Sequence, residues 1–305
     1  MRLIAPDYYP AFRCIADRCR HSCCIGWEID IDPSSRERYR RISGAFGQRL
    51  NAAIEDTDAG AWFRLDGDER CPMLNENGLC DLITACGEET LCQICADHPR
   101  FRSFFADRTE IGLGLCCEAA ALLVLGREEP VRLVTLEDDG GKEVLPESEA
   151  ALLKRREALI SIAQDRRQPV VSRLQIMLES VDAAIPERDW IAVYRALERL
   201  DPAWDVVLDT LREAAPPEHL SAAFEQFTVY LLYRHLPGAL EDSDIPGRVM
   251  LCVLSVQMLM ALCASREGCT LADCAELARM YSAEIEYSED NIAALLDALW
   301  ESCSF

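Results

Sequence analysis

Four cysteines lie within eleven residues near the start of the chain, at Cys14, Cys19, Cys23 and Cys24. Seven more follow by position 117, namely Cys71, Cys80, Cys86, Cys92, Cys95, Cys116 and Cys117. A thiolate is a strong, soft donor for zinc or for an iron–sulfur cluster, and disulfides rarely persist in a reducing compartment. The thiols therefore indicate ligation of a metal or cluster rather than ordinary core packing.

The spacing leaves the kind of metal open. The first group has the pattern C-x4-C-x3-C-C, whereas zinc sites usually present two C-x2-C pairs and the only such pair here is Cys92 with Cys95. Radical enzymes that use S-adenosylmethionine carry C-x3-C-x2-C, and Gly26 stands where the third cysteine would be. Iron–sulfur ligands can also come from distant loops. Zinc and an iron–sulfur cluster both remain, with His21 as a further candidate donor.

Several cysteine motifs follow one another in a fixed order between residues 12 and 125. They are Phe12-x-Cys14-x4-Cys19-x3-Cys23-Cys24-x2-Trp27, Cys71-Pro72-x-Leu74, Gly78-Leu79-Cys80, Cys95-x3-Pro99-Arg100 and Cys117-x-Ala119. Together they resemble the flagellin lysine-N-methylase family, and the first is similar to a broader group of zinc- or iron-chelating cysteine-cluster proteins.

This resemblance implies a methyltransferase that transfers methyl from S-adenosylmethionine to lysine ε-amines of flagellin and carries an iron–sulfur cluster of the 4Fe-4S type, with zinc as the alternative. Its pattern has no thiol at Cys86, Cys92 or Cys116. It identifies no catalytic residue and no residue for S-adenosylmethionine. The metal ligands that it implies are Cys14, Cys19, Cys23, Cys24, Cys71, Cys80, Cys95 and Cys117.

The charge composition limits which classes of partner the protein can bind. Across 305 residues, Asp and Glu outnumber Lys and Arg by 53 to 31, which gives a net charge of −22. That field repels nucleic acid and anionic membranes and is compatible with a protein substrate that bears lysines. The N-terminus lacks the apolar core of a secretory signal, and the apolar run 249–264 is too short for a typical membrane span. We therefore expect a cytoplasmic protein, of open oligomeric state, in which this run is a buried helix.

The elements that must position the thiols follow from local signals. Asp32 before Pro33 predicts a helix that continues to about Ile54, and Thr270 with Asp273 predicts another helix start. An Asn-Gly turn between Cys71 and Cys80 predicts a small hairpin. Gly112-Leu113-Gly114 lacks the βαβ pattern of a nucleotide-binding turn.

The predicted fold is mainly α: a cysteine-rich region with a small β hairpin at 1–127, a linker or small hairpin at 128–147, and an all-α domain at 148–305. The strands of the second hairpin would be 131–136 and 142–145. Five later cysteines lie in apolar helical surroundings and are expected in the core, namely Cys252, Cys263, Cys269, Cys274 and Cys303.

Two functional hypotheses follow. The first is the lysine methyltransferase. The second is a non-catalytic zinc- or iron-binding structural or interaction protein, in which a closed site only holds the N-terminal region together.

Overall fold

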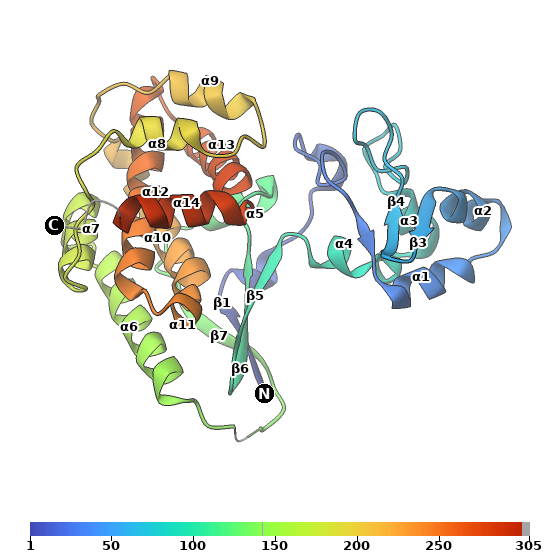
Figure 1. Cartoon of the computed structure of the whole chain (residues 1–305), viewed down its shortest axis with the longest axis horizontal. Coiled ribbons are helices and arrows are strands. Elements are labelled where there is room, and N and C mark those ends of the chain that lie inside the picture. The colour runs from blue at the N-terminus through green and yellow to red at the C-terminus, as the bar shows by residue number, and fades with distance from the viewer. Residues whose placement is uncertain (142, 301–305) are drawn as a thin grey trace. The chain divides into compact units, whose positions relative to one another are not determined.

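The computed structural model describes residues 1–141 and 143–300, which form two compact units (Figure 1). The cysteine-rich unit comprises residues 13–100, and the helical unit comprises residues 1–12 together with 101–305. The protein is mainly α, as predicted. These units divide the chain at positions other than 128–147, because the first strand pairs with strands that follow residue 100.

The helical unit contains a four-stranded sheet with the order β5-β6-β1-β7. Its first strand runs parallel to β6 and antiparallel to β7, so that Arg2 lies opposite both Arg108 and Asp138. Pairing with β1 takes the place of the hairpin predicted for β7, since residues 143–145 form no strand and Lys142 lies outside the described residues. The strand bounds are β1 Arg2–Pro6, β5 Arg100–Phe105, β6 Arg108–Leu113 and β7 Leu133–Asp138.

Helices make up most of the same unit (Figure 1). The capping box of Thr270 and Asp273 starts α13, as predicted. Their bounds are α5 Glu118–Leu125, α6 Glu147–Ala163, α7 Val170–Glu179, α8 Trp190–Ala196, α9 Ala203–Asp209, α10 Ser221–His235, α11 Ala239–Asp242, α12 Ile245–Ser265, α13 Leu271–Tyr281 and α14 Glu289–Trp300.

The core of this unit is built on α10 and α12, which pack against each other. By length and composition α12 is the one helix in the described part of the chain that could cross a membrane, but 78% of its apolar window is buried inside the protein. Such burial is typical of a core helix and confirms the prediction for 249–264. Cys252, Cys263, Cys269 and Cys274 are buried here, and Cys303 lies outside the described residues.

The cysteine-rich unit contains short elements around a small core. An antiparallel sheet has the order β2-β4-β3, and β3 and β4 form a hairpin. Asp32 caps α1 as predicted, but this helix ends at Arg40 and a second helix starts at Gly44, whose φ of +80° breaks the run. The bounds are α1 Pro33–Arg40, α2 Gly44–Ala52, α3 Asp81–Cys86, α4 Gln93–Asp97, β2 Asp30–Ile31, β3 Ile54–Thr57 and β4 Gly60–Phe63.

Candidate metal centre

Backbone pairing brings Cys24 and Cys71 together. Ile25 forms an isolated antiparallel bridge with Arg70, and the Cys71 N–H donates to the Cys24 carbonyl over 2.8 Å. Gly26, with a φ of +91°, turns the chain directly after this contact. Two thiols that are 47 positions apart in sequence thus share one short stretch of paired backbone.

Cys80 joins this pair through a tight loop. The Asn75 side-chain oxygen accepts from the N–H groups of Asn77 and Leu79, and Leu74 pairs with Cys80 in a single bridge. The hairpin predicted between Cys71 and Cys80 is therefore reduced to a loop closed by one bridge. The loop still brings the two thiols into electrostatic interaction, since Cys80 helps to raise the pKa of Cys71.

Cys92 and Cys95 enter from α4, where Cys92 is the N-cap residue. The Asp32 carboxylate accepts from the Gln93 N–H over 2.9 Å and so connects the start of α1 to the start of α4. Cys92 is fully buried, and beside it lies the equally buried Tyr39, whose hydroxyl interacts with the Cys92 thiol and helps to lower its pKa. The Tyr39 hydroxyl is therefore placed to donate to the Cys92 sulfur.

The pKa values show how closely these thiols interact. A hydrogen bond from Cys23 lowers the pKa of Cys24 to about 7 although burial opposes the change. The hydrogen bond between Cys92 and Cys95 lowers the pKa of Cys92 to about 7 and, with burial, raises the pKa of Cys95.

Burial raises the pKa of Cys71 to about 12 and also raises that of Cys80. The Cys95 thiol interacts in turn with those of Cys24 and Cys71. Pairwise interactions therefore connect five thiols of the cysteine-rich unit, called here the gathered thiols, namely Cys24, Cys71, Cys80, Cys92 and Cys95.

The remaining thiols of the first motif lie in a loop with one short 3-10 turn, Ala16–Arg18. Cys14 and Cys23 are exposed and Cys19 is partly exposed. The Cys14 sulfur accepts from the Ala16 N–H, and the Cys19 thiol donates to the His21 carbonyl. Of these thiols, Cys23 lies beside the gathered thiol Cys24.

Trp27 helps to shape this loop. Its indole N–H donates to the Cys23 carbonyl over 2.6 Å, and its ring lies 6.1 Å from that of His98. The Trp27 ring thus fixes the backbone next to the Cys23 and Cys24 thiols.

Cys117 belongs to the helical unit, where it is the N-cap residue of α5. Burial raises the pKa of its neighbour Cys116 to about 12, and Cys116 lies beside Tyr287 and Arg234. Cys86, at the end of α3, is partly buried. Neither Cys86 nor Cys116 is among the five gathered thiols.

The thiols match the predicted metal or cluster in donor type. Five thiols in one small unit are the donor type that zinc and iron–sulfur clusters prefer, and the Tyr39 hydroxyl beside Cys92 would suit a sulfur that carries charge. Within residues 1–141 and 143–300, however, no three His, Cys, Asp or Glu side chains are arranged to share one ion. The thiols are therefore suitable donors for zinc or an iron–sulfur cluster, and which of them coordinate it stays a prediction.

Sequence reasoning set Cys92 aside, yet its thiol lies within the gathered group. The signal that could have found it is its C-x2-C spacing from Cys95, which one helical turn brings onto one side. The resemblance had included only Cys95 from this pair.

A buried polar cluster in the helical unit also escaped the sequence analysis. The Glu286 carboxylate accepts from Tyr230 over 2.9 Å and from His235 over 2.6 Å, and it pairs with Arg234 at 3.3 Å. Burial raises the pKa of Glu286, but the Arg234 charge and the His235 hydrogen bond outweigh it and lower the pKa to about 2. Burial lowers the pKa of His235, so a neutral His235 donates its Nε2 proton to an ionised carboxylate.

Two details of this cluster concern its surroundings. Glu286 ends a π-helical turn at Ser282–Glu286, a feature that is frequent at functional sites. The Arg234 guanidinium lies 5.0 Å from the ring of Phe101 and 4.9 Å from that of Tyr287, which also contacts Cys116. The cluster therefore fixes the environment of Cys116, next to the predicted ligand Cys117.

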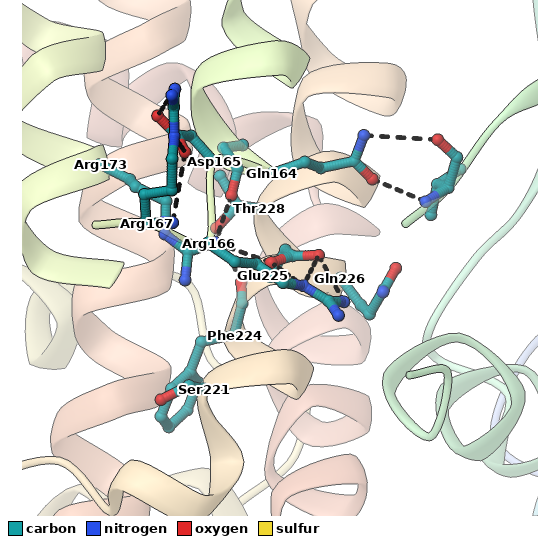
Figure 2. Close-up of polar contacts among 12 residues, drawn as sticks. Gln164, Asp165, Arg166, Arg167, Arg173, Ser221, Phe224, Glu225, Gln226 and Thr228 are labelled. Atoms are coloured by element: carbon teal, nitrogen blue, oxygen red, sulfur yellow. Dashed lines mark hydrogen bonds and ion pairs between the residues drawn. The ribbon is translucent and has the colours of Figure 1, made fainter. Parts of the chain in front are cut away.

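A second buried charge, Glu225, lies on α10 (Figure 2). Its carboxylate is 1% exposed and accepts from Arg166 over 2.9 Å and from Arg173 over 2.7 Å. Two guanidinium groups thus neutralise one buried carboxylate, which is a structural role.

One segment of the chain is similar to known proteins. A segment of 134 residues, 42% of this chain, is 22% identical to the flagellar biosynthetic protein FliU of Salmonella muenchen and covers 79% of it. Segments of the same length and identity match the lysine-N-methylases of Salmonella typhimurium strain LT2 and Salmonella choleraesuis strain SC-B67. The chain resembles the lysine-N-methylases.

This result confirms the resemblance inferred from the cysteine motifs. The matched segment spans 33% of each lysine-N-methylase. No family model matches the chain. No solved structure matches it either.

Proposed function

We propose that this protein is a cytoplasmic protein-lysine N-methyltransferase that uses S-adenosylmethionine and carries a cysteine-ligated iron–sulfur cluster. One observation supports it above the others: the chain resembles lysine-N-methylases, and its cysteine-rich unit gathers Cys24, Cys71, Cys80, Cys92 and Cys95. The substrate would be a protein that bears lysines, of the flagellar kind that the names of the relatives suggest.

The transfer needs little from the metal itself. In a direct displacement the neutral amine nitrogen attacks the methyl carbon, the bond from carbon to sulfur breaks, S-adenosylhomocysteine leaves and the amine proton passes to water. The cluster would supply structure and, with an open position, a binding point for the donor. The chain's own contribution is to hold the thiols by the Cys24–Cys71 backbone pairing and by α4.

A second candidate is the non-catalytic metal-binding protein. It is favoured by the extent of the match, since the matched segment spans only 33% of each lysine-N-methylase. In this case zinc or a closed cluster would stabilise the cysteine-rich unit without chemistry.

The experiment begins with anaerobic purification, analysis of iron, zinc and labile sulfide, and an absorption spectrum with and without S-adenosylmethionine. The protein is then incubated with flagellin and methyl-labelled donor, and products are found by mass spectrometry. The chain contains only two lysines of its own, Lys142 and Lys154, so label on the substrate is easily separated from self-methylation. Labelled lysine in flagellin supports the methyltransferase.

Matched cysteine variants test the site. We expect Cys71→Ser to lose the metal or cluster and Cys86→Ser to retain it, because Cys71 belongs to the five gathered thiols and Cys86 does not. Metal-loaded protein that neither binds S-adenosylmethionine nor labels flagellin would favour the second candidate. Colourless protein with one equivalent of zinc would exclude the iron–sulfur cluster.

A further inference from the structure

A cavity of 580 Å³ lies in the helical unit, lined by residues of β1, β6, β7, α6 and α10. Protein interiors are packed as densely as organic crystals, so an opening of this size is not ordinary packing. Ligand pockets usually fall between about 300 and 1,000 Å³. The cavity therefore has the size of a small-molecule site, and nothing in the proposed methyl transfer uses it.

One part of the cavity wall is apolar. Six aliphatic side chains from both the strands and the helices form it: Val131, Leu133, Leu145, Leu153, Ile160 and Val229. A surface of this kind binds an apolar body through the hydrophobic effect.

The other part of the wall is cationic, with Arg108, Lys154 and Arg156 against one carboxylate, Glu157. Arg156 is only 4% exposed and is held by Glu110 at 2.7 Å and over the ring of Tyr233 at 5.1 Å. Its Nη1 nitrogen is buried without a hydrogen-bond partner among the described residues. A fixed positive charge therefore lies in the wall of the cavity.

Arg108 and Lys154, the other two cations of this wall, can each pair with a further anionic group. Asp107 pairs with both Arg2 and Arg108, and Arg108 uses Nε and Nη2 for it, which leaves Nη1 for another acceptor. Lys154 is exposed on α6 and makes no ion pair with any residue that the structure describes.

The charged residues of the cavity wall, together with the ion pairs in which they take part, comprise four cations and three carboxylates, in a chain whose net charge is −22. The cations are Arg2, Arg108, Lys154 and Arg156, and the carboxylates are Asp107, Glu110 and Glu157. The excess is a single positive charge, which one monoanionic group would neutralise.

We propose that this cavity binds a small amphiphilic carboxylate. The apolar body of the ligand packs against the aliphatic wall, and its carboxylate pairs with Lys154 and the free Nη1 of Arg108. A doubly charged phosphate would leave one negative charge uncompensated, so a carboxylate matches the site better. The proposal stands independently of the metal and of methyl transfer.

The test uses the full chain and decanoate as the probe, measured by isothermal titration calorimetry. We expect one equivalent to bind, and decan-1-ol, which has the same apolar body without the charge, to bind at least about tenfold more weakly. Absence of decanoate binding would overturn the proposal. So would equal affinity for the alcohol, since the cations would then have no role.

Three variants on α6 locate the site. Lys154→Glu reverses a charge at the cavity and should weaken decanoate binding by about tenfold or more, whereas Arg155→Glu reverses the neighbouring charge, which does not line the cavity, and should change it by less than about twofold. Ala150→Trp places a ring into the cavity from an exposed position and should abolish binding. Equal effects of the two charge reversals, or full binding by Ala150→Trp, would contradict the assignment.

Discussion

The two units of the molecule are held together in different ways. In the helical unit the core includes the 15-residue helix α10 and the 21-residue helix α12, and buried ion pairs such as Glu225 with Arg173 are enclosed by apolar side chains. In the cysteine-rich unit the helices have only five to nine residues, and two of the buried core residues are cysteines, Cys71 and Cys92. The larger unit can be stabilised by its core alone.

This difference indicates which of the two units a bound metal would stabilise. Small domains bury too little apolar surface for independent stability and usually need disulfides or metals. In the cysteine-rich unit the thiols lie where regular structure is scarce, on the isolated bridges and at the start of α4. Metal binding at these thiols would therefore be the main stabilising contribution to this unit, and it would contribute little to the helical unit.

Metal removal should have the largest effect, because it should unfold the cysteine-rich unit and leave the helical unit folded. Structural zinc contributes about 10–16 kcal/mol of folding free energy in small peptide domains, so removal of a metal held by these thiols should unfold residues 13–100. The measurement is amide hydrogen exchange by mass spectrometry on the full chain before and after chelation. We expect protection to be lost within 13–100 and kept in α10 and α12.

The control for this experiment is the Cys86→Ser variant, which should respond to the chelator as the unchanged protein does. If protection within 13–100 is the same with and without metal, the cysteine-rich unit is stabilised by its small core and the comparison between the units fails.

The buried charges of the helical unit should give the next largest effect. Glu225→Gln would leave Arg166 and the 6% exposed Arg173 without their counter-charge, and removal of one partner from a buried ion pair costs about 3–5 kcal/mol. Urea denaturation monitored by circular dichroism measures the free energy of unfolding. We expect it to fall by that amount.

Arg167→Gln is the matched control for this prediction (Figure 2). Arg167 is 87% exposed and pairs with Asp165 at the surface, so its loss should cost less than about 1 kcal/mol. If the Glu225 variant were as mildly affected, the buried network would not be an important stabilising element of the helical unit.

The comparison also shows what the sequence could predict. The cap at Asp32, the capping box at Thr270 and the buried helix at 249–264 were predicted correctly, because each depends on residues that are close in the chain. The pairing of β1 with β6 and β7 joins positions more than a hundred residues apart, so no local signal reports it. The same reason explains why the boundary between the units did not follow from composition.

The candidate site was predictable to a similar degree. Thiol chemistry and the resemblance indicated Cys24, Cys71, Cys80 and Cys95, and these four lie together. Burial of Cys92 beside Tyr39 comes from the packing of α1 against the start of α4, which motif spacing does not show. In the buried cluster, Glu286 contacts Tyr230 and His235, which are 56 and 51 positions away in the sequence, and these residues belong to no sequence motif.

The smallest expected effect on stability comes from the link between α1 and α4 in the cysteine-rich unit. Asp32 accepts from the Ser35 N–H as N-cap and from the Gln93 N–H next to Cys92, both over 2.9 Å. Asp32→Ala should destabilise this unit by about 1 kcal/mol, as typical for loss of an N-cap, whereas Asp32→Asn keeps one of the two oxygen acceptors, lacks the charge and should destabilise it by a smaller amount at pH 7. Hydrogen exchange in α1 and α4 at constant metal loading measures both.

Acid then distinguishes a charge effect from a capping effect at the same residue. Burial raises the pKa of Asp32, but donors from Ser34, Gln93 and Ser35 outweigh it and hold the pKa well below its ordinary value of 3.8. A carboxyl whose pKa is lower in the folded state stabilises it above the ordinary pKa, and this contribution is lost as the pH falls below about 4. The free-energy difference between the unchanged protein and Asp32→Asn should therefore shrink on acidification. A difference that stays constant with pH would show that Asp32 acts only through the geometry of its hydrogen bonds, and that its charge does not stabilise the thiol-bearing helix α4.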